Sequence, residues 1–145
     1  FKSANQSIYI LKVQMSPGQS DSILVPISLG ELVDKITILE IKAANLNGHK
    51  LDNTQQELAA LKATLSSINK PIEQSLIESL RHVNQSLCTI DDDISDHERR
   101  ENFGPGFIAL ARSVYQQNDK RASIKKEINL RYDSKLIEEK SYAPY

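Results

Sequence analysis

One long stretch without a helix breaker constrains the fold more than any other part of this sequence. Residues 107–132 read FIALARSVYQQNDKRASIKKEINLRY; they follow a Gly-Pro-Gly turn and contain no further glycine or proline. At about 3.6 residues per turn, the stretch predicts a helix of about seven turns. Its apolar side chains recur on one helical face, and they are Phe107, Leu110, Ala111, Val114, Ala122, Ile128 and Tyr132.

Polar and cationic side chains continue this face toward its C-terminal end. They are Asn118, Arg121, Lys125 and Asn129. Arg and Lys are almost never fully buried without a partner. The two positive charges therefore need a partner, which could be a carboxylate elsewhere in the chain, a second subunit or a ligand. Glu40 is one candidate carboxylate. In the simpler alternative, both cations extend to solvent or pair with Glu40 and the acidic residues 91–96.

Three further helices are predicted upstream of the long one, and the four spans lie near residues 28–47, 53–69, 71–100 and 105–132. Ser28 and Glu31 have the spacing of a capping box, and Thr54 and Glu57 repeat it. Pro71 suits the first position of the third helix. The third helix carries a regular apolar seam of Ile72, Leu76, Leu80, Val83, Leu87, Ile90 and Ile94.

The predicted fold class is all-α, an antiparallel bundle of about four helices that includes a long helical hairpin. In the first helix, Ile38 and Ile41 lie off the main apolar stripe, so this helix is expected to be contacted from two sides. That double face and the long seam of the third helix favour a homodimer.

The two ends of the chain carry weaker signals. Residues 7–13 and 23–27 have strand-type composition, which makes a short N-terminal β-hairpin an alternative for this part. Residues 1–22 are expected to be an extension and residues 23–145 to form one helical domain. Either residues upstream of Phe1 are missing, or Met15 is the natural start. Residues 135–140 are expected to add one short turn.

Composition excludes several functional classes. Charged residues make up 26% of the chain and the formal net charge is −1, so no general attraction to nucleic acid is expected. No apolar run approaches the 18 or so residues of a membrane span, so no membrane partner is expected. Cys88 is the only cysteine, which suits a reducing, cytoplasmic compartment. No cofactor-binding motif is present, so the protein is expected to bind no cofactor.

An acidic cluster near the end of the third helix is a candidate metal site. It consists of Asp92, Asp93, Asp96 and His97. Asp93 and His97 are four residues apart, so both side chains could reach one metal ion. Glu31 and Asp34 would have to supply the second acidic pair, as in all-α nucleotide pyrophosphatases that hold magnesium. A solvated acidic helix end is the alternative.

The cationic face of the long helix is the second candidate site. Two cations four residues apart can grip a carboxylate or a phosphate, and flanking amides can orient it. The proposed ligand-binding residues are Arg121, Lys125, Asn118, Asn129, Glu40 and Arg112. In its chemistry this set is similar to the all-helical chorismate mutases, in which a dimeric bundle holds a dicarboxylate. The N-terminal Arg and Asp pattern of those enzymes is not present here.

Three segments carry a family resemblance: ISLGELVDKITILEIK at 27–42, HERRENFGPGFIALARSVYQQNDKRASIKKEIN at 97–129, and EEKSY at 138–142. In this order they resemble a family of small bacterial proteins of unknown function. Members of that family lie in gene neighbourhoods with glycosyltransferases and tetratricopeptide proteins, which implies a role near glycan or surface-polysaccharide biosynthesis. The resemblance supplies no catalytic residues.

Because the sequence contains no complete catalytic set, it favours a non-catalytic interaction or adaptor module with a protein partner. Two alternatives stay open. One is a small-anion-binding enzyme with an Arg, Lys and Glu pocket inside the bundle, and the other is a magnesium-dependent nucleotide pyrophosphatase. Whether the protein is an enzyme is undecided at this level.

Overall fold

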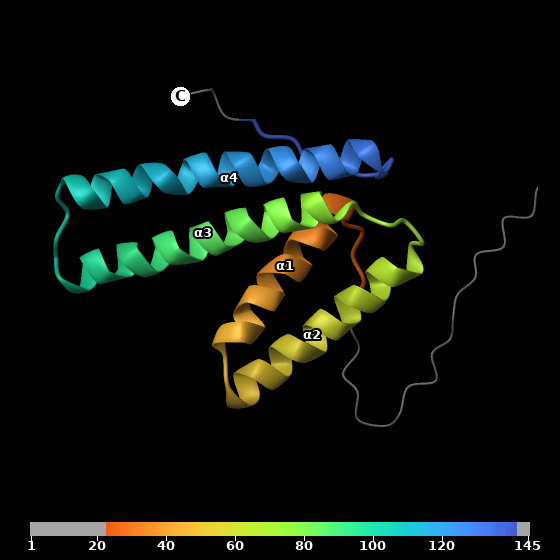
Figure 1. Ribbon diagram of the computed structural model, residues 1–145, viewed down its shortest axis with the longest axis horizontal. Coiled ribbons are helices and arrows are strands. Elements are labelled where there is room, and N and C mark those ends of the chain that lie inside the picture. Colours follow the sequence, from red (N-terminus) through yellow and green to blue (C-terminus); the bar gives the residue numbers. More distant parts are fainter. Residues whose placement is uncertain (1–22, 142–145) are drawn as a thin grey trace, which may run out of the picture.

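Four helices make up most of residues 23–141, the part of the chain that the computed structural model describes. They are α1 (Leu29–Asn45), α2 (Gly48–Ser67), α3 (Gln74–Arg99) and α4 (Pro105–Arg131). Figure 1 shows α3 and α4 as a long antiparallel hairpin, with the shorter hairpin of α1 and α2 set against one end of it. The all-α helical bundle and its long hairpin are therefore confirmed.

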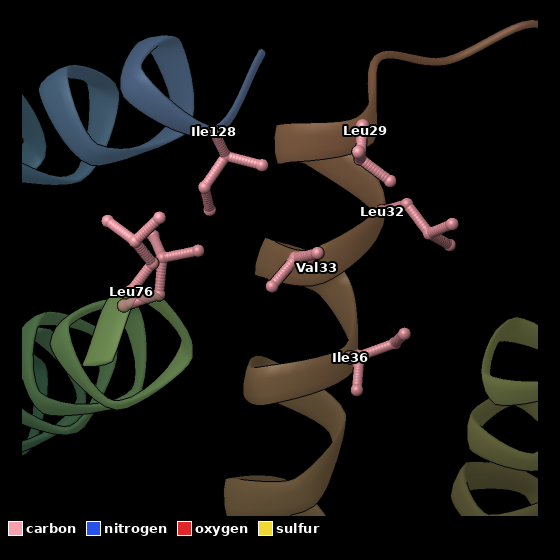
Figure 2. Packing of buried hydrophobic residues seen from close by; sticks show 7 residues of the cluster. Leu29, Leu32, Val33, Ile36, Leu76 and Ile128 are labelled. Carbon is pink, nitrogen blue, oxygen red and sulfur yellow. The ribbon is translucent and has the colours of Figure 1, made fainter. Parts of the chain in front are cut away.

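Helix α1 is the centre of the fold, because it packs against each of the other three helices. Val33 points toward Leu76 of α3 and Ile128 of α4, whereas Leu32 points to the side where α2 lies (Figure 2). Leu32, Val33 and Ile128 are all buried. The expected double apolar face of this helix is thus used within a single chain.

The start of α1 is fixed by its cap and by a close approach to α4. Ser28 Oγ accepts a hydrogen bond from the backbone N–H of Glu31, as the capping-box spacing predicts. The Glu31 side chain binds Lys125 in place of returning to the cap. At Gly30, a Cβ atom would lie 2.5 Å from the carbonyl oxygen of Lys125, so α1 and α4 meet where only glycine fits.

Two helix starts differ from the sequence prediction. Helix α2 begins at Gly48, six residues before the predicted cap at Thr54, and Thr54 Oγ1 donates to the carbonyl of Lys50 inside the helix. Helix α3 begins at Gln74, three residues after Pro71. Pro71 lies in the loop that joins α2 to α3 and is not the first residue of the helix. Because α2 already contains the turn before Thr54, the Thr54 hydroxyl bonds back to that turn and does not cap the helix.

The far end of the α3–α4 hairpin projects beyond α1 and α2 (Figure 1). In α4 the buried residues are Ile128 and Asn129, both near its C-terminal end. Farther out, Ile90, Ile94, Leu110 and Val114 are only half-buried. This projecting part, residues 88–118, is called the arm below.

After α4 the chain reverses and runs back beside that helix (Figure 1). Asp133 has a φ of 50°, and the N–H of Ser134 donates to the carbonyl of Asn129 at 2.8 Å, closing the turn. Residues 134–141, called the tail below, contain no helical turn, so the predicted short turn at 135–140 is wrong.

The structure describes only the second strand of the predicted N-terminal hairpin. Its first run, residues 7–13, lies outside the described residues. Its second run, residues 23–27, forms no strand. Within residues 23–141, no helix combines the length and the apolar character needed to cross a bilayer.

Candidate functional site

Ion pairs attach the tail to α4. The charged tail residues 138–140 each pair with a residue of opposite charge on the helix. Glu139 pairs with Lys126 at 2.9 Å, and Lys140 pairs with Asp119. Glu138 takes part in the most buried of these contacts, described below. Ser134 Oγ also accepts a hydrogen bond from the N–H of Leu29, so the tail closes over the start of α1.

Between α4 and the tail lies a pocket of about 550 Å3. Val114 and Tyr115 form an apolar and aromatic end of its α4 wall, and Ala122 lies farther along the helix, beside Arg121. The other side chains that α4 contributes to the wall are polar or charged: Asn118, Asp119, Arg121, Lys125, Lys126 and Asn129. The four residues of the polar face predicted from the sequence (118, 121, 125 and 129) therefore all line one cavity.

Lys125 is neutralised by two carboxylates. Its Nζ lies 2.5 Å from Glu31 Oε2 and 2.6 Å from Glu138 Oε2. Burial acts to lower the pKa of Lys125, but the hydrogen bonds to Glu138 and Glu31 more than reverse this, so its pKa lies above the ordinary value. Through these two ion pairs, Lys125 of α4 connects α1 to the tail.

Arg121 is held in a different way, by a buried amide. Its Nη1 lies 3.5 Å from Asn84 Oδ1, and no carboxylate among residues 23–141 comes within ion-pair distance of it. Asn84 Nδ2 donates in turn to Asp34 Oδ1 at 2.7 Å and to Thr37 Oγ1 at 2.9 Å. Because Asn84, Asp34 and Thr37 are buried, this chain of hydrogen bonds fixes the position of Arg121 from behind.

Asp34 is a buried carboxyl that faces Arg121 across Asn84. Only 4% of it is exposed. Burial raises its pKa, against the hydrogen bond from Asn84 and the nearby charges of Arg121 and Lys125. Asp34 does not line the pocket. Its charge therefore acts on Arg121 at a distance, and it is not placed to exchange a proton with a molecule in the cavity.

Asn129 lines the pocket and carries a buried side-chain donor that has no partner within residues 23–141. The residue is 1% exposed, and its Oδ1 accepts a hydrogen bond from the N–H of Gly30 at 2.7 Å. Its Nδ2 has no hydrogen-bond partner within residues 23–141. A buried amide donor without a partner is costly, so an acceptor from outside residues 23–141 would stabilise it.

Two of the predicted ligand-binding residues lie elsewhere. Glu40 pairs with Lys62 and Arg81 at 2.7 and 2.6 Å, so the prediction that it opposes the cations of α4 is wrong. Burial acts to raise its pKa, but these two partners hold the pKa below its usual range. Arg112 is exposed on the arm, where its Nε lies 3.4 Å from the Tyr115 hydroxyl, and it does not line the pocket.

The structure does not assemble the predicted metal site. Asp96 pairs with Arg99, and His97 Nδ1 is bonded to the carbonyl of Asn102 at 2.8 Å in the α3–α4 turn. Glu31 and Asp34 face α4 and α3 near the pocket instead. Among residues 23–141, no three His, Cys, Asp or Glu side chains are grouped to hold a metal ion.

Sequence reasoning missed the residues that complete the site, which are Asp34, Thr37, Asn84 and Glu138. One signal was available: Asn84 follows Val83 in the apolar seam of α3, where a polar residue has to find a buried partner. A second was the acidic pair in EEKSY, which matches the adjacent lysines Lys125 and Lys126.

We expect Glu138→Gln to destabilise the protein at neutral pH by about 0.5–1 kcal/mol, since half of this side chain is open to solvent. Burial acts to raise the pKa of Glu138, but hydrogen bonds from Lys125 and Ser28 hold it below 4.5. A lowered carboxyl pKa stabilises the fold above its unfolded value, and this contribution is lost as the pH falls through the folded pKa. Urea unfolding should therefore separate the variant from wild type at pH 7 and bring them together in acid.

Glu139→Gln is the matched control, because its pair with Lys126 is exposed. It should change the unfolding free energy by no more than a few tenths of a kcal/mol, roughly, at either pH. An equal effect of both variants would contradict the special role given to Glu138.

Comparison with known proteins gives a family match. A model of a family of unknown function matches residues 22–145, which include all of the described residues 23–141. This confirms the resemblance predicted from the three sequence segments. A search of curated proteins and a search of solved structures each found no match.

Proposed function

We propose that this chain, which belongs to the family of unknown function DUF6165, binds a small anion in the pocket between α4 and the tail. The observation that carries the proposal is the state of Arg121. It is a half-buried guanidinium with one long hydrogen bond to an amide oxygen and no carboxylate within ion-pair distance among residues 23–141. Such a group is costly to bury unless an acceptor completes its hydrogen bonds.

The neighbouring cations support this assignment, because each has a carboxylate partner in the tail or on α4. Lys125 has Glu138 as well as Glu31, Lys126 has Glu139, and Lys140 has Asp119. An incoming anion would have to displace a carboxylate at any of the three lysines. At Arg121 it would find an unused planar fork that matches a carboxylate or a phosphate. The sequence predicted that Arg121 and Lys125 bind the anion together. We now propose that Arg121 alone binds it.

The pocket amides support an acceptor-bearing ligand. Asn129, in the same wall, has a buried Nδ2 without a partner within residues 23–141, and Asn118 lies between the apolar end of the pocket and Arg121. We assign binding and no reaction, since the buried carboxyl of Asp34 is separated from the cavity by Asn84.

Thermal unfolding with and without anions tests the proposal. The probes are acetate, benzoate, citrate and inorganic phosphate. We expect at least one of them to raise the unfolding midpoint of wild type, since a ligand at a hundred times its Kd adds about 2.7 kcal/mol. The shift should vanish in Arg121→Gln, which removes the charge and keeps a polar side chain.

Arg112→Gln is the matched control, because Arg112 is an arginine of the same helix that lies outside the pocket. It should keep the full shift. A flat response in wild type, or a shift that survives in Arg121→Gln, would overturn the proposal.

A second candidate, the helical interaction module, is favoured by the arm. Its apolar seam is covered by a single neighbouring helix, and Ile108 and Phe103 at its end are exposed. A two-helix hairpin with a half-buried seam offers a face for a further helix, either from a second copy or from another protein. No anion response together with a molecular weight that rises with concentration would favour this candidate over the pocket.

A further inference from the structure

We infer that the pocket takes a singly charged organic acid with an apolar or ring-shaped body. Its acidic group would lie at Arg121 and its body against Val114, Tyr115 and Ala122. This inference rests on the proposed function and goes further, since it names the class of ligand and the residues that select it.

The first argument is the order of side chains along α4. Tyr115 and Arg121 are six residues apart, which is about 9 Å along a helix axis. Asn118 lies between them in sequence, and all three line the same pocket. An acid group and a six-membered ring joined by a short linker fit that spacing. A bare inorganic anion would contact the Arg121 end only.

The second argument is the size and chemistry of the cavity. At about 550 Å3 it lies within the range of pockets that enclose drug-sized organic ligands. Ala122 is next to Arg121 in the wall, and Val114 and Tyr115 lie about two turns toward the N-terminus of α4. Apolar and aromatic surface of this kind gains free energy by covering a ligand's hydrocarbon and nothing by covering an inorganic ion.

The charge balance of the pocket limits the ligand to one negative charge. Apart from Arg121, the cations of the pocket are matched by Glu138, Glu139 and Asp119 within the wall, with Glu31 beside them. Buried Asp34 lies behind Arg121. A ligand with two or three carboxylates would place its extra charges near these carboxylates, where like charges repel.

Three probes test the inference: 3-phenylpropionate, propionate, which lacks the ring, and citrate, which lacks the ring and has three acid groups. Binding is followed by titration of amide NMR signals. We expect wild type to bind 3-phenylpropionate at least tenfold more tightly than propionate or citrate, because the ring buries apolar surface and the extra charges of citrate would meet the carboxylates of the wall. Tyr115→Ala should weaken 3-phenylpropionate binding at least fivefold and leave propionate binding unchanged. Tyr115→Phe, which keeps the ring, should restore the affinity.

The two proposals fail in different ways. Binding of propionate or citrate that depends on Arg121 and is as tight as that of 3-phenylpropionate, or no loss of affinity in Tyr115→Ala, would overturn the ligand class and leave the anion site standing. No binding of any acid, or binding that is unchanged in Arg121→Gln, would overturn both. Tyr115 is exposed in part, so its replacement by Ala is expected to leave the fold intact.

Discussion

Ile128→Ala is expected to lower the free energy of unfolding by about 2–5 kcal/mol, the largest loss we predict for a single substitution in this protein. Ile128 is fully buried and belongs to the cluster that joins α4 to α1 and α3 (Figure 2). Truncation removes apolar contacts with both neighbours and leaves a cavity where three helices meet. Helix α4 has few other buried residues, so little surface remains to compensate. Urea unfolding followed by circular dichroism gives the value.

Leu130→Ala is the control for the same helix. Leu130 is two residues farther along and 58% exposed. Its replacement should change stability by less than about 0.5–1 kcal/mol, as is usual at surface positions. If the two variants were destabilised equally, the packing of α4 on α1 would have to differ from the arrangement described above.

The helices and their apolar faces could be predicted because they depend on local spacing. The capping pair Ser28 and Glu31 fixed the start of α1, and the unbroken stretch before Arg131 indicated the long α4. The start of α2 could not be found in this way. Thr54 and Glu57 have the spacing of a cap, but the turn from α1 is so short that α2 already begins at Gly48. A local motif cannot report the length of the preceding connection.

The cations of the candidate site could be predicted from the sequence, but the residues that they contact could not. Arg121 and Lys125 share a helical face with Asn118 and Asn129, which periodicity shows directly. Lys125 meets Glu31 from 94 residues away, and Arg121 meets Asn84 from 37 residues away. Those contacts depend on how α1 and α3 cross α4, which helical spacing does not determine. Glu40 was assigned to the wrong cations for the same reason, since it faces α2 and α3 through Lys62 and Arg81.

Gly30→Ala is the substitution with the second-largest expected effect, a loss of about 2 kcal/mol and roughly 6 °C in the unfolding midpoint. In an isolated helix the change would stabilise by at most about 1 kcal/mol. Here the added Cβ would lie 2.5 Å from the carbonyl oxygen of Lys125, a backbone atom that cannot rotate away, and 3.0 Å from Asn129 Oδ1. The clash therefore outweighs the gain in helix propensity, and the hydrogen bond from Gly30 to Asn129 is strained with it.

The same shift would reach the pocket, because Gly30 lies where α1 contacts the segment of α4 that carries Lys125 and Asn129. Gly30→Ala should thus weaken ligand-induced stabilisation as well as the fold. Gly104→Ala is the matched control: its Cβ would approach only Asn102 Oδ1, at 3.4 Å, so it should cost less than about 1 kcal/mol as a change at a helix cap. If Gly30→Ala proved as stable as wild type, helix propensity would outweigh packing, and the close approach of α1 to α4 would not be what places Asn129 in the pocket wall.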